Sequence, residues 1–198
     1  MRKRNKIVTG IGTLLLLAGV GGLGVRFYEQ RSIRMELERL PELLAIKPGV
    51  VVGEIGAGKG EMAKGLAVSV GPGGRILATE IDAKLLRELR SLGVANLTVI
   101  EAGERETRLP AGCCDAVYMR KVYHHFSDPA AIAADLYRAV RPGGWAVVID
   151  FPPRWWLGGH GVRRERVVEG LTRAGFVEAR SMEEWPGLNY CVVLRRPG

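Results

Sequence analysis

A chain of 198 residues, 47% hydrophobic and 25% charged, is long enough to bury a core and has a globular composition, which excludes a disordered or low-complexity protein. The formal net charge is +8, but five of the 29 basic residues lie within residues 1–26, which hold no acid. The rest of the chain carries 24 basic and 21 acidic residues, without a Lys/Arg stripe interleaved with aromatic residues. No nucleic-acid partner is therefore expected.

The cysteines are few and are placed in a way that does not favour a disulfide framework. Cys113 and Cys114 are adjacent, and Cys191 makes the count odd. No pair has the spacing of metal ligands, so no metal site is expected. We predict buried free thiols in a reducing compartment.

Residues 1–26 are predicted to be a basic, hydrophobic N-terminal membrane segment that precedes a domain over residues 27–198. Residues 7–25 form an uncharged run between Lys6 and Arg26. As a helix this run would be roughly 28 Å long, which is close to the hydrocarbon thickness of a bilayer. We therefore expect a transmembrane helix that anchors the protein. A cleaved signal peptide, with export of the domain, and a buried helix are the alternatives.

Beyond this segment, helical periodicity alternates with short apolar runs, and Gly/Pro turns separate them. Asp128 followed by Pro129 is typical of a helix N-terminus, and residues 141–144, Arg-Pro-Gly-Gly, form a stop signal. The expected helices cover residues 27–45, 60–70, 84–92, 128–140 and 163–174. The expected strands cover residues 50–55, 75–80, 97–101, 115–119, 145–150, 176–181 and 190–194.

Alternation of helices with apolar strands predicts a parallel sheet that is covered on both faces. The last two strands are joined by a loop without a long helix and should pair antiparallel. The expected fold is α/β: a Rossmann-like, doubly wound, seven-stranded sheet, mostly parallel with an antiparallel last strand, preceded by an N-terminal hydrophobic helix. Ligands of such sheets bind at the carboxyl ends of the strands, which places the site after the first strand.

A glycine-rich loop follows the first strand, with glycines at positions 56, 58 and 60. This spacing lets the backbone approach a ligand, at which the next helix aims its free N–H groups. Glu80 lies twenty residues beyond Gly60, at the end of the second strand. A carboxylate there can accept the ribose hydroxyls of an adenosine. The loop and Glu80 together predict a site for an adenosine-containing cofactor.

Two acidic residues favour S-adenosylmethionine over a dinucleotide. Glu61 stands where the nicotinamide fingerprint needs glycine. Glu54, just before the loop, would repel a pyrophosphate but suits the ammonium group of a methionine. A nicotinamide-dependent oxidoreductase remains an alternative, as does a tight strand-to-helix turn without a ligand. A phosphate-binding loop of the nucleotide hydrolase type is not expected, because no Gly-Lys-Ser/Thr ending is present.

Several stretches between residues 41 and 194 resemble motifs of the class I S-adenosylmethionine-dependent methyltransferases. Residues 54–60 look like the first motif of that family, and residues 78–82 look like the acidic end of its second strand. Residues 109–117 are similar to the fourth-strand motif, and residues 136–144 to the turn before the fifth strand. The closing Ala-Gly-Phe at residues 174–176 also matches.

The resemblance implies S-adenosylmethionine as the cofactor, with its methionine end at the glycine loop, its ribose at Glu80 and its adenine near Glu104. The expected cofactor-binding residues are Glu54, Gly56, Ala57, Gly58, Gly60, Glu80, Ile81, Glu104 and Met119.

The acceptor of the methyl group should lie after the fourth and fifth strands. Residues 123–126, Tyr-His-His-Phe, resemble the small-molecule and quinone-ring branch of the family. No Asn-Pro-Pro-Tyr run follows the fourth strand, which argues against methylation of exocyclic base amines. We expect methyl transfer to a small or lipid-like acceptor; the alternative is a non-catalytic S-adenosylmethionine-binding module. The candidate catalytic residues are His124, His125, Asp150 and His160.

Basic residues on both flanks of the hydrophobic run give conflicting signals on topology. The basic residues among the first six favour a cytoplasmic N-terminus, so a single span would place the domain outside, away from cytosolic S-adenosylmethionine. Arg26, Arg31, Arg34 and Arg39 on the other flank oppose that orientation. We expect the domain on the cytoplasmic side, and a shallow insertion that does not span the bilayer would also resolve the conflict.

Overall fold

The structure, a computed structural model, describes Gly24 and residues 26–198. A helix over residues 26–43 precedes the first strand and is called the N-terminal helix below. The strands are β1 (Val51–Ile55), β2 (Arg75–Glu80), β3 (Leu97–Glu101), β4 (Cys114–Arg120), β5 (Val140–Asp150), β6 (Val177–Trp185) and β7 (Asn189–Arg195). The labelled helices are α2 (Glu61–Val70), α3 (Ala83–Arg90), α4 (Pro129–Ala139) and α5 (Arg164–Arg173), with 3-10 turns η1 (Tyr123–His125) and η2 (Trp155–Leu157).

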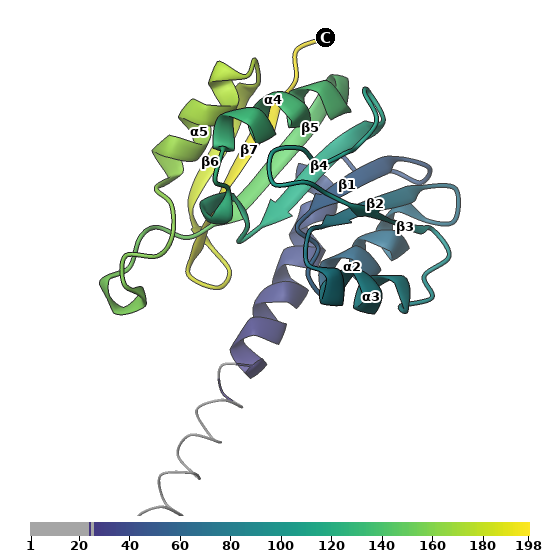
Figure 1. The fold of residues 1–198 in the computed structure, drawn as a ribbon, viewed down its shortest axis with the longest axis horizontal. Helices are drawn as coiled ribbons and strands as arrows, with labels where there is room; N and C mark the ends of the chain where they lie inside the picture. Colours follow the sequence, from purple (N-terminus) through teal and green to yellow (C-terminus); the bar gives the residue numbers. More distant parts are fainter. Residues whose placement is uncertain (1–23, 25) are drawn as a thin grey trace, which may run out of the picture.

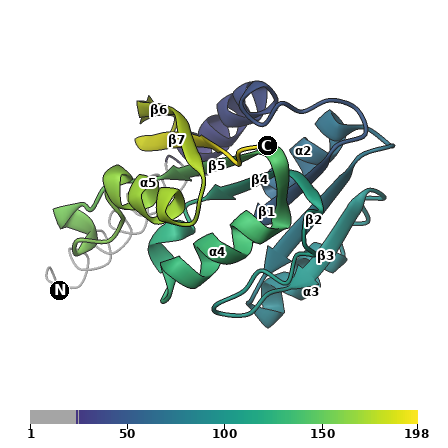
Figure 2. The same cartoon turned by 90° about the horizontal axis from the view of Figure 1, so that it is seen from above.

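The strands form one sheet in the order β3-β2-β1-β4-β5-β7-β6. All neighbouring pairs from β3 to β5 are parallel, and β7 runs antiparallel between β5 and β6. Figures 1 and 2 show the sheet with helices on both sides. The predicted seven-stranded, Rossmann-like sheet with an antiparallel last strand is confirmed. The strand order reverses beside β1, so the carboxyl ends of β1, β2 and β4 frame the expected ligand site.

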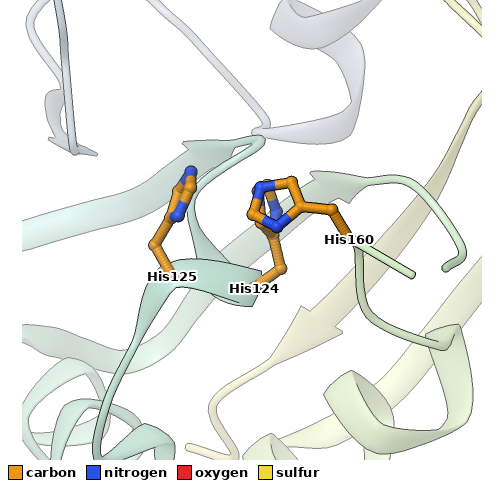
Figure 3. A group of neighbouring side chains, drawn as sticks. All are labelled: His124, His125 and His160. Carbon is orange, nitrogen blue, oxygen red and sulfur yellow. The ribbon is translucent and has the colours of Figure 1, made fainter. Parts of the chain in front are cut away.

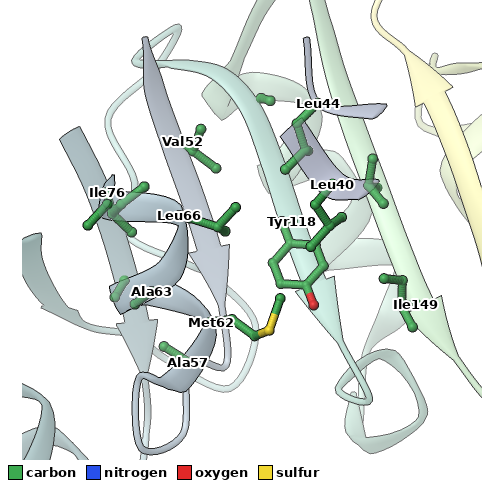
Figure 4. Close-up of a cluster of buried hydrophobic side chains, with 14 of the residues drawn as sticks. Leu40, Leu44, Val52, Ala57, Met62, Ala63, Leu66, Ile76, Tyr118 and Ile149 are labelled. Atoms are coloured by element: carbon green, nitrogen blue, oxygen red, sulfur yellow. The ribbon is translucent and has the colours of Figure 1, made fainter. Parts of the chain in front are cut away.

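Two apolar layers hold the sheet between its helices. On one face, Leu66 of α2 and Leu40 of the N-terminal helix pack over Val52 and Tyr118 (Figure 4). On the other face, α4 and α5 cover the sheet through residues that include Leu136. The N-terminal helix is therefore part of the domain core, and its position fixes the carboxyl end of β4.

Local capping explains where two of the helices begin. The carboxylate of Asp82 accepts hydrogen bonds from the N–H groups of Lys84 (2.8 Å) and Leu85 (2.9 Å) at the start of α3. Asp128 accepts one from Ala131 (3.0 Å) at the start of α4, next to Pro129 at the first helical position. The predicted cap at Asp128 is confirmed, and such caps satisfy N–H groups that have no partner within the helix.

The predicted turn at residues 141–144 is an irregularity within β5 instead of a break before it. Pairing with β4 passes from Cys114–Val140 to Ala116–Trp145, so residues 141–144 bulge from the ladder. Gly144 is needed there, because a Cβ would lie 2.7 Å from the carbonyl oxygen of Asp115. The helix α4 thus ends before residues 141–144, as expected. The strand β5, however, begins at Val140 and not at residue 145 as predicted.

The predicted membrane segment lies outside the described residues, except for Gly24 and Arg26. Within the part of the chain that the structure describes, no helix combines the length and the apolar character that a membrane span requires. The cysteines lie within the domain, where Cys114 and Cys191 are buried, Cys113 is half-buried, and all three thiols are free.

Candidate functional site

A cavity of about 550 Å³ lies at the carboxyl ends of β1, β2 and β4. Its volume is within the range of small-molecule sites. Of the residues predicted from the sequence, six line this cavity: Gly56, Gly58, Glu80, Ile81, Glu104 and His125.

The three glycines of the loop after β1 serve two purposes. All three have positive φ angles, at which other residues are strained. A Cβ on Gly56 would lie 2.4 Å from Val122, and one on Gly60 would lie 2.6 Å from Leu92. A Cβ on Gly58 would meet no atom within 4 Å. Gly56 and Gly60 therefore permit close packing within the protein, whereas Gly58 leaves open space at the cavity.

Glu80 joins the loop to the end of β2. Its Oε2 accepts a hydrogen bond from the Gly58 N–H (2.9 Å), and its Oε1 accepts from the N–H groups of Ile81 (2.8 Å) and Asp82 (3.1 Å). A carboxylate can accept about four such bonds. Glu80 therefore holds the loop in place and retains capacity for a hydroxyl group in the cavity.

Glu54 presents a buried carboxylate without a full set of partners. The residue is 4% exposed, and its Oε2 has no hydrogen-bond partner among the described residues. Burial raises the pKa of Glu54 to about 8, an effect that nearby Arg120 opposes and Glu80 reinforces. An unsatisfied buried carboxylate is costly, so this oxygen calls for a cationic or hydrogen-bonding partner.

The remaining predicted cofactor residues do not line the cavity. Glu54, Ala57 and Gly60 are not among its lining residues: Glu54 and Ala57 are buried, and Gly60 is the N-cap of α2. Met119 is fully buried and packs in the apolar layer beneath α4, because successive β4 side chains point to opposite faces of the sheet. The side chain of Met119 therefore lies in the core, and Met119 does not line the cavity.

His124 and Asp150 form a buried pair at the carboxyl ends of β4 and β5. Nδ1 of His124 lies 2.7 Å from Oδ1 of Asp150, and the two side chains are 3% and 0% exposed. The N–H groups of His124 (3.2 Å) and Phe151 (2.9 Å) also donate to this carboxylate. Burial raises the pKa of Asp150, and these contacts oppose the rise. A carboxylate partner fixes Nδ1 as the protonated nitrogen and leaves Nε2 of His124 free to accept.

His125 and His160 lie beside this pair, so the structure brings together all four predicted catalytic residues. The His124 ring centroid is 4.0 Å from that of His125 and 4.5 Å from that of His160 (Figure 3). Both neighbours are exposed. Partial burial lowers the pKa of His125, and the positive potential of the two other imidazoles lowers it further, against an opposing effect of Asp150.

A charged network that the sequence did not predict borders the cavity. Arg120 and Lys121 line the cavity at the end of β4. Arg120 donates to Glu36 (2.8 Å) and Glu29 (2.7 Å) of the N-terminal helix, and Lys121 also pairs with Glu29 (2.9 Å). Glu29 and Glu36 are seven residues apart and so lie on one helix face. An arginine at the end of a buried strand needs acidic partners. The position of Arg120 in the sequence could therefore have indicated that such partners exist, but not which residues they are.

Comparison with known proteins agrees with this geometry. A family model described as a methyltransferase domain matches residues 53–148, which include the glycine loop, Glu80 and the β4 end. This chain belongs to the class I S-adenosylmethionine-dependent methyltransferases. Its methyl donor is S-adenosylmethionine, which removes the nicotinamide alternative.

The relatives of this methyltransferase include enzymes whose names refer to small molecules. It is 31% identical over 133 residues to nocamycin O-methyltransferase of Saccharothrix syringae, covering 65% of this chain and 46% of that protein. It is 30% identical over 115 residues to the ubiquinone/menaquinone biosynthesis C-methyltransferase UbiE of Ralstonia pickettii (strain 12J), covering 56% and 47%. The chain thus spans about half the length of these curated relatives.

Solved structures of the family show the same fold. A methyltransferase from Aquifex aeolicus that depends on S-adenosylmethionine superposes with a TM-score of 0.70 at 21% identity, covering 81% of this chain and 89% of that one. The residues of this methyltransferase fit the cofactor. Glu54 has an unsatisfied buried oxygen that would suit the ammonium group, Gly58 leaves space at the loop, and Glu80 keeps acceptor capacity that would suit the ribose.

Proposed function

We propose that the whole protein transfers a methyl group from S-adenosylmethionine to a small or lipid-like acceptor. The observation that carries the proposal is the composition of the cavity, whose lining combines acidic and glycine residues with His125 and Phe126. Val122 and Ile132 add apolar surface there. Both relatives named above carry names of small-molecule methyltransferases.

When bound, S-adenosylmethionine supplies a methyl group that is already activated by the positive charge of its sulfonium. The protein then has to hold the acceptor at near-attack distance and in line with the transfer. We assign this role to the wall formed by His124, His125 and His160. Asp150 is a positioning residue, because it fixes the ring of His124 and is itself fully buried.

The test begins with calorimetric titration of the full chain with S-adenosylmethionine, S-adenosylhomocysteine and NADH. We expect micromolar binding of the two sulfur ligands and none of NADH. Label transfer from methyl-labelled S-adenosylmethionine is then measured with phenols and hydroxylated quinones, each with and without a prenyl tail. Product with any acceptor supports the enzyme. Cofactor binding without product from the whole panel would favour the non-catalytic module, and no binding by folded protein would refute the proposal.

We further propose that the protein is attached to the membrane by residues 7–25, with the domain on the cytoplasmic side. Several exposed apolar side chains of the described domain are compatible with a bilayer surface. Phe27 is 72% exposed, Trp155 86% and Leu188 63%. The N-terminal helix, the loop after β5 and the turn between β6 and β7 border one groove, to which Tyr28, Arg154 and Leu188 contribute.

Exposed tryptophans and arginines on one side of a molecule suit the headgroup region, because their side chains combine an apolar body with a polar end. Figure 1 shows the loop and the β6–β7 turn on the side of the domain from which the N-terminal helix projects. A lipid-like acceptor would then be available where the protein is anchored.

A further inference from the structure

The chain contains three histidines, and all three meet at one place. His124 and His125 belong to η1, and His160 lies in the loop after β5. One ring nitrogen of each residue lies within 4.8 Å of the others. Figure 3 shows the three labelled rings, with that of His160, which comes from its own loop, in front of that of His124.

The backbone holds His160 in this position. Arg154 donates its N–H to the carbonyl oxygen of His160 (3.3 Å), and Val162 donates to Phe151 (3.0 Å). Gly161, at a φ of +122°, is so close to the start of the loop that a Cβ would lie 2.7 Å from the Phe151 oxygen. The loop therefore closes on itself and returns His160 to the ends of β4 and β5.

Asp150 holds the ring of His124 through a contact that is also typical of metal-ligating histidines. Ligating histidines almost always donate their second ring N–H to a carboxylate, a carbonyl oxygen or water, which fixes the ring and raises its basicity. The 2.7 Å contact between Nδ1 of His124 and the buried Asp150 has this form. Nε2 of His124 is the nitrogen that remains for an ion.

The other two rings are able to adjust to an ion. Zinc–nitrogen bonds of 2.0–2.1 Å in a tetrahedral site require nitrogens about 3.3 Å apart, which is closer than the present limit of 4.8 Å. His125 and His160 are exposed, and among the described residues neither ring takes part in a hydrogen bond. A rotation of these side chains therefore closes the gap without disturbing the core.

We propose that His124, His125 and His160 bind one divalent late first-row transition-metal ion, such as Zn²⁺. Three imidazoles suit these ions, whereas Mg²⁺ and Ca²⁺ prefer oxygen ligands. Three protein ligands leave a coordination position open, as in catalytic rather than structural zinc sites. His125 also lines the cofactor cavity, so the ion would lie at its rim. The site itself does not depend on the proposed methyl transfer.

The test is a titration of the full chain, prepared without a histidine tag, with Co²⁺ as a spectroscopic substitute for Zn²⁺. We expect one equivalent to bind with the visible absorption of nitrogen-ligated Co²⁺. Zn²⁺ should displace it, in line with the higher affinity of Zn²⁺ for such ligands, and Mg²⁺ should not. The absence of stoichiometric binding, or displacement by Mg²⁺, would overturn the proposal.

Single-residue variants test whether the bound Co²⁺ is held by the three histidines. His160→Ala and His125→Ala should each weaken Co²⁺ binding by more than about 100-fold, and Asp150→Asn by about 10–100-fold, the range for an outer-shell partner. Trp155→Ala, in the same loop, is the matched control and should bind as the wild type does. Thermal unfolding of each variant checks the fold. Wild-type affinity in either folded histidine variant would refute the site and point to the cysteines.

Discussion

Arg120, the last residue of β4, donates from Nε to Oε2 of Glu36 on the N-terminal helix over 2.8 Å, although the two are 84 positions apart in the sequence. The Glu36 side chain is fully buried and the Arg120 side chain is 12% exposed. Because Arg120 also lines the cavity, this contact ties the N-terminal helix to the wall of the cofactor site.

Glu36→Ala should lower the free energy of unfolding by about 3 kcal/mol. Removal of Glu36 leaves the largely buried Arg120 with the half-buried Glu29 as its remaining described counter-charge, and the loss of one member of a buried charged network is more costly than the pair itself is stabilising. Equilibrium urea unfolding of the two proteins measures the difference. Glu38→Ala, on the same helix but in an exposed pair with Arg34, is the control and should change stability by less than about 0.5 kcal/mol. Equal effects would show that the buried contact is unimportant.

Cofactor binding should release a proton from Glu54. The pKa of this carboxyl is raised to about 8 in the free protein, so most of it is protonated at pH 7. Contact with an ammonium group favours the ionised form. A group that must lose its proton makes binding tighter as the pH rises toward 8, by up to about tenfold per pH unit.

Calorimetry in two buffers with different ionisation enthalpies counts this proton. Glu54→Gln cannot release it, so the variant should bind more weakly at pH 8 and should lose the difference between the buffers. Titration of the cofactor's own amino group is common to both proteins and cancels in the comparison. A wild-type count near zero at pH 7 would mean that Glu54 does not face the ammonium group.

Glu80→Ala should weaken S-adenosylmethionine binding by about 1–3 kcal/mol, the range for polar groups left without a partner. The loss combines the ribose contact with the three backbone N–H groups that Glu80 holds. Glu101→Ala is a matched control, since Glu101 is the neighbour of Glu80 in register on β3 and is exposed. Unchanged affinity of Glu80→Ala would refute the ribose assignment.

Gly58→Ala should impair cofactor binding beyond its effect on stability. Gly58 (φ +57°) and Gly71 (φ +69°) both have a positive φ, and a Cβ at either would meet no protein atom within 4 Å. Alanine should therefore cost about 1–3 kcal/mol of stability through backbone strain, with the larger cost at Gly71, whose ψ of 179° is adopted almost only by glycine. Of these two glycines, Gly58 lines the cavity and Gly71 does not. We expect affinity for S-adenosylmethionine to fall at least about tenfold, or 1.4 kcal/mol, in Gly58→Ala. Gly71→Ala should bind normally; equal affinities would place the cofactor away from the loop.

Deletion of residues 1–26 should release the protein from membranes with its fold intact. The deletion spares Glu29 and Glu36, so the contacts with Arg120 remain. Flotation with vesicles and circular dichroism measure the two properties. If the shortened protein stays with the vesicles, replacement of Trp155 and Trp156 by alanine tests whether their exposed rings form a second attachment surface.

Local sequence signals were sufficient for the sheet but not for contacts between distant residues. The bounds of β2 and β3 were predicted to the residue, because turns flank both strands. The start of β5 was missed, since its pairing at Val140 depends on β4 and not on local propensity. Glu54 and Glu80 were found because their positions relative to the glycines carry the signal.

The histidine cluster illustrates what spacing cannot reveal. His124 and His125 are adjacent, but His160 joins them only because backbone hydrogen bonds close its loop. The partner of Arg120 was likewise unpredictable, since a helix and a strand end meet only in the folded protein. Met119 was among the residues expected at the cofactor, but its side chain is buried in the apolar layer beneath α4.

The closed loop between Phe151 and Val162 has a consequence for how this protein can change. Its two ends are joined by the hydrogen bond from the Val162 N–H to the Phe151 carbonyl oxygen. Changes of conformation between these ends should therefore leave the sheet undisturbed. A Cβ at the exposed Gly158 or Gly159 would meet no atom within 4 Å, so a substitution there has only the strain of a positive φ to overcome, whereas a Cβ at Gly161 would also collide with the backbone. The loop is thus an exchangeable cassette: a graft from another protein could alter acceptor preference while the machinery at β1 and β2 stays as it is.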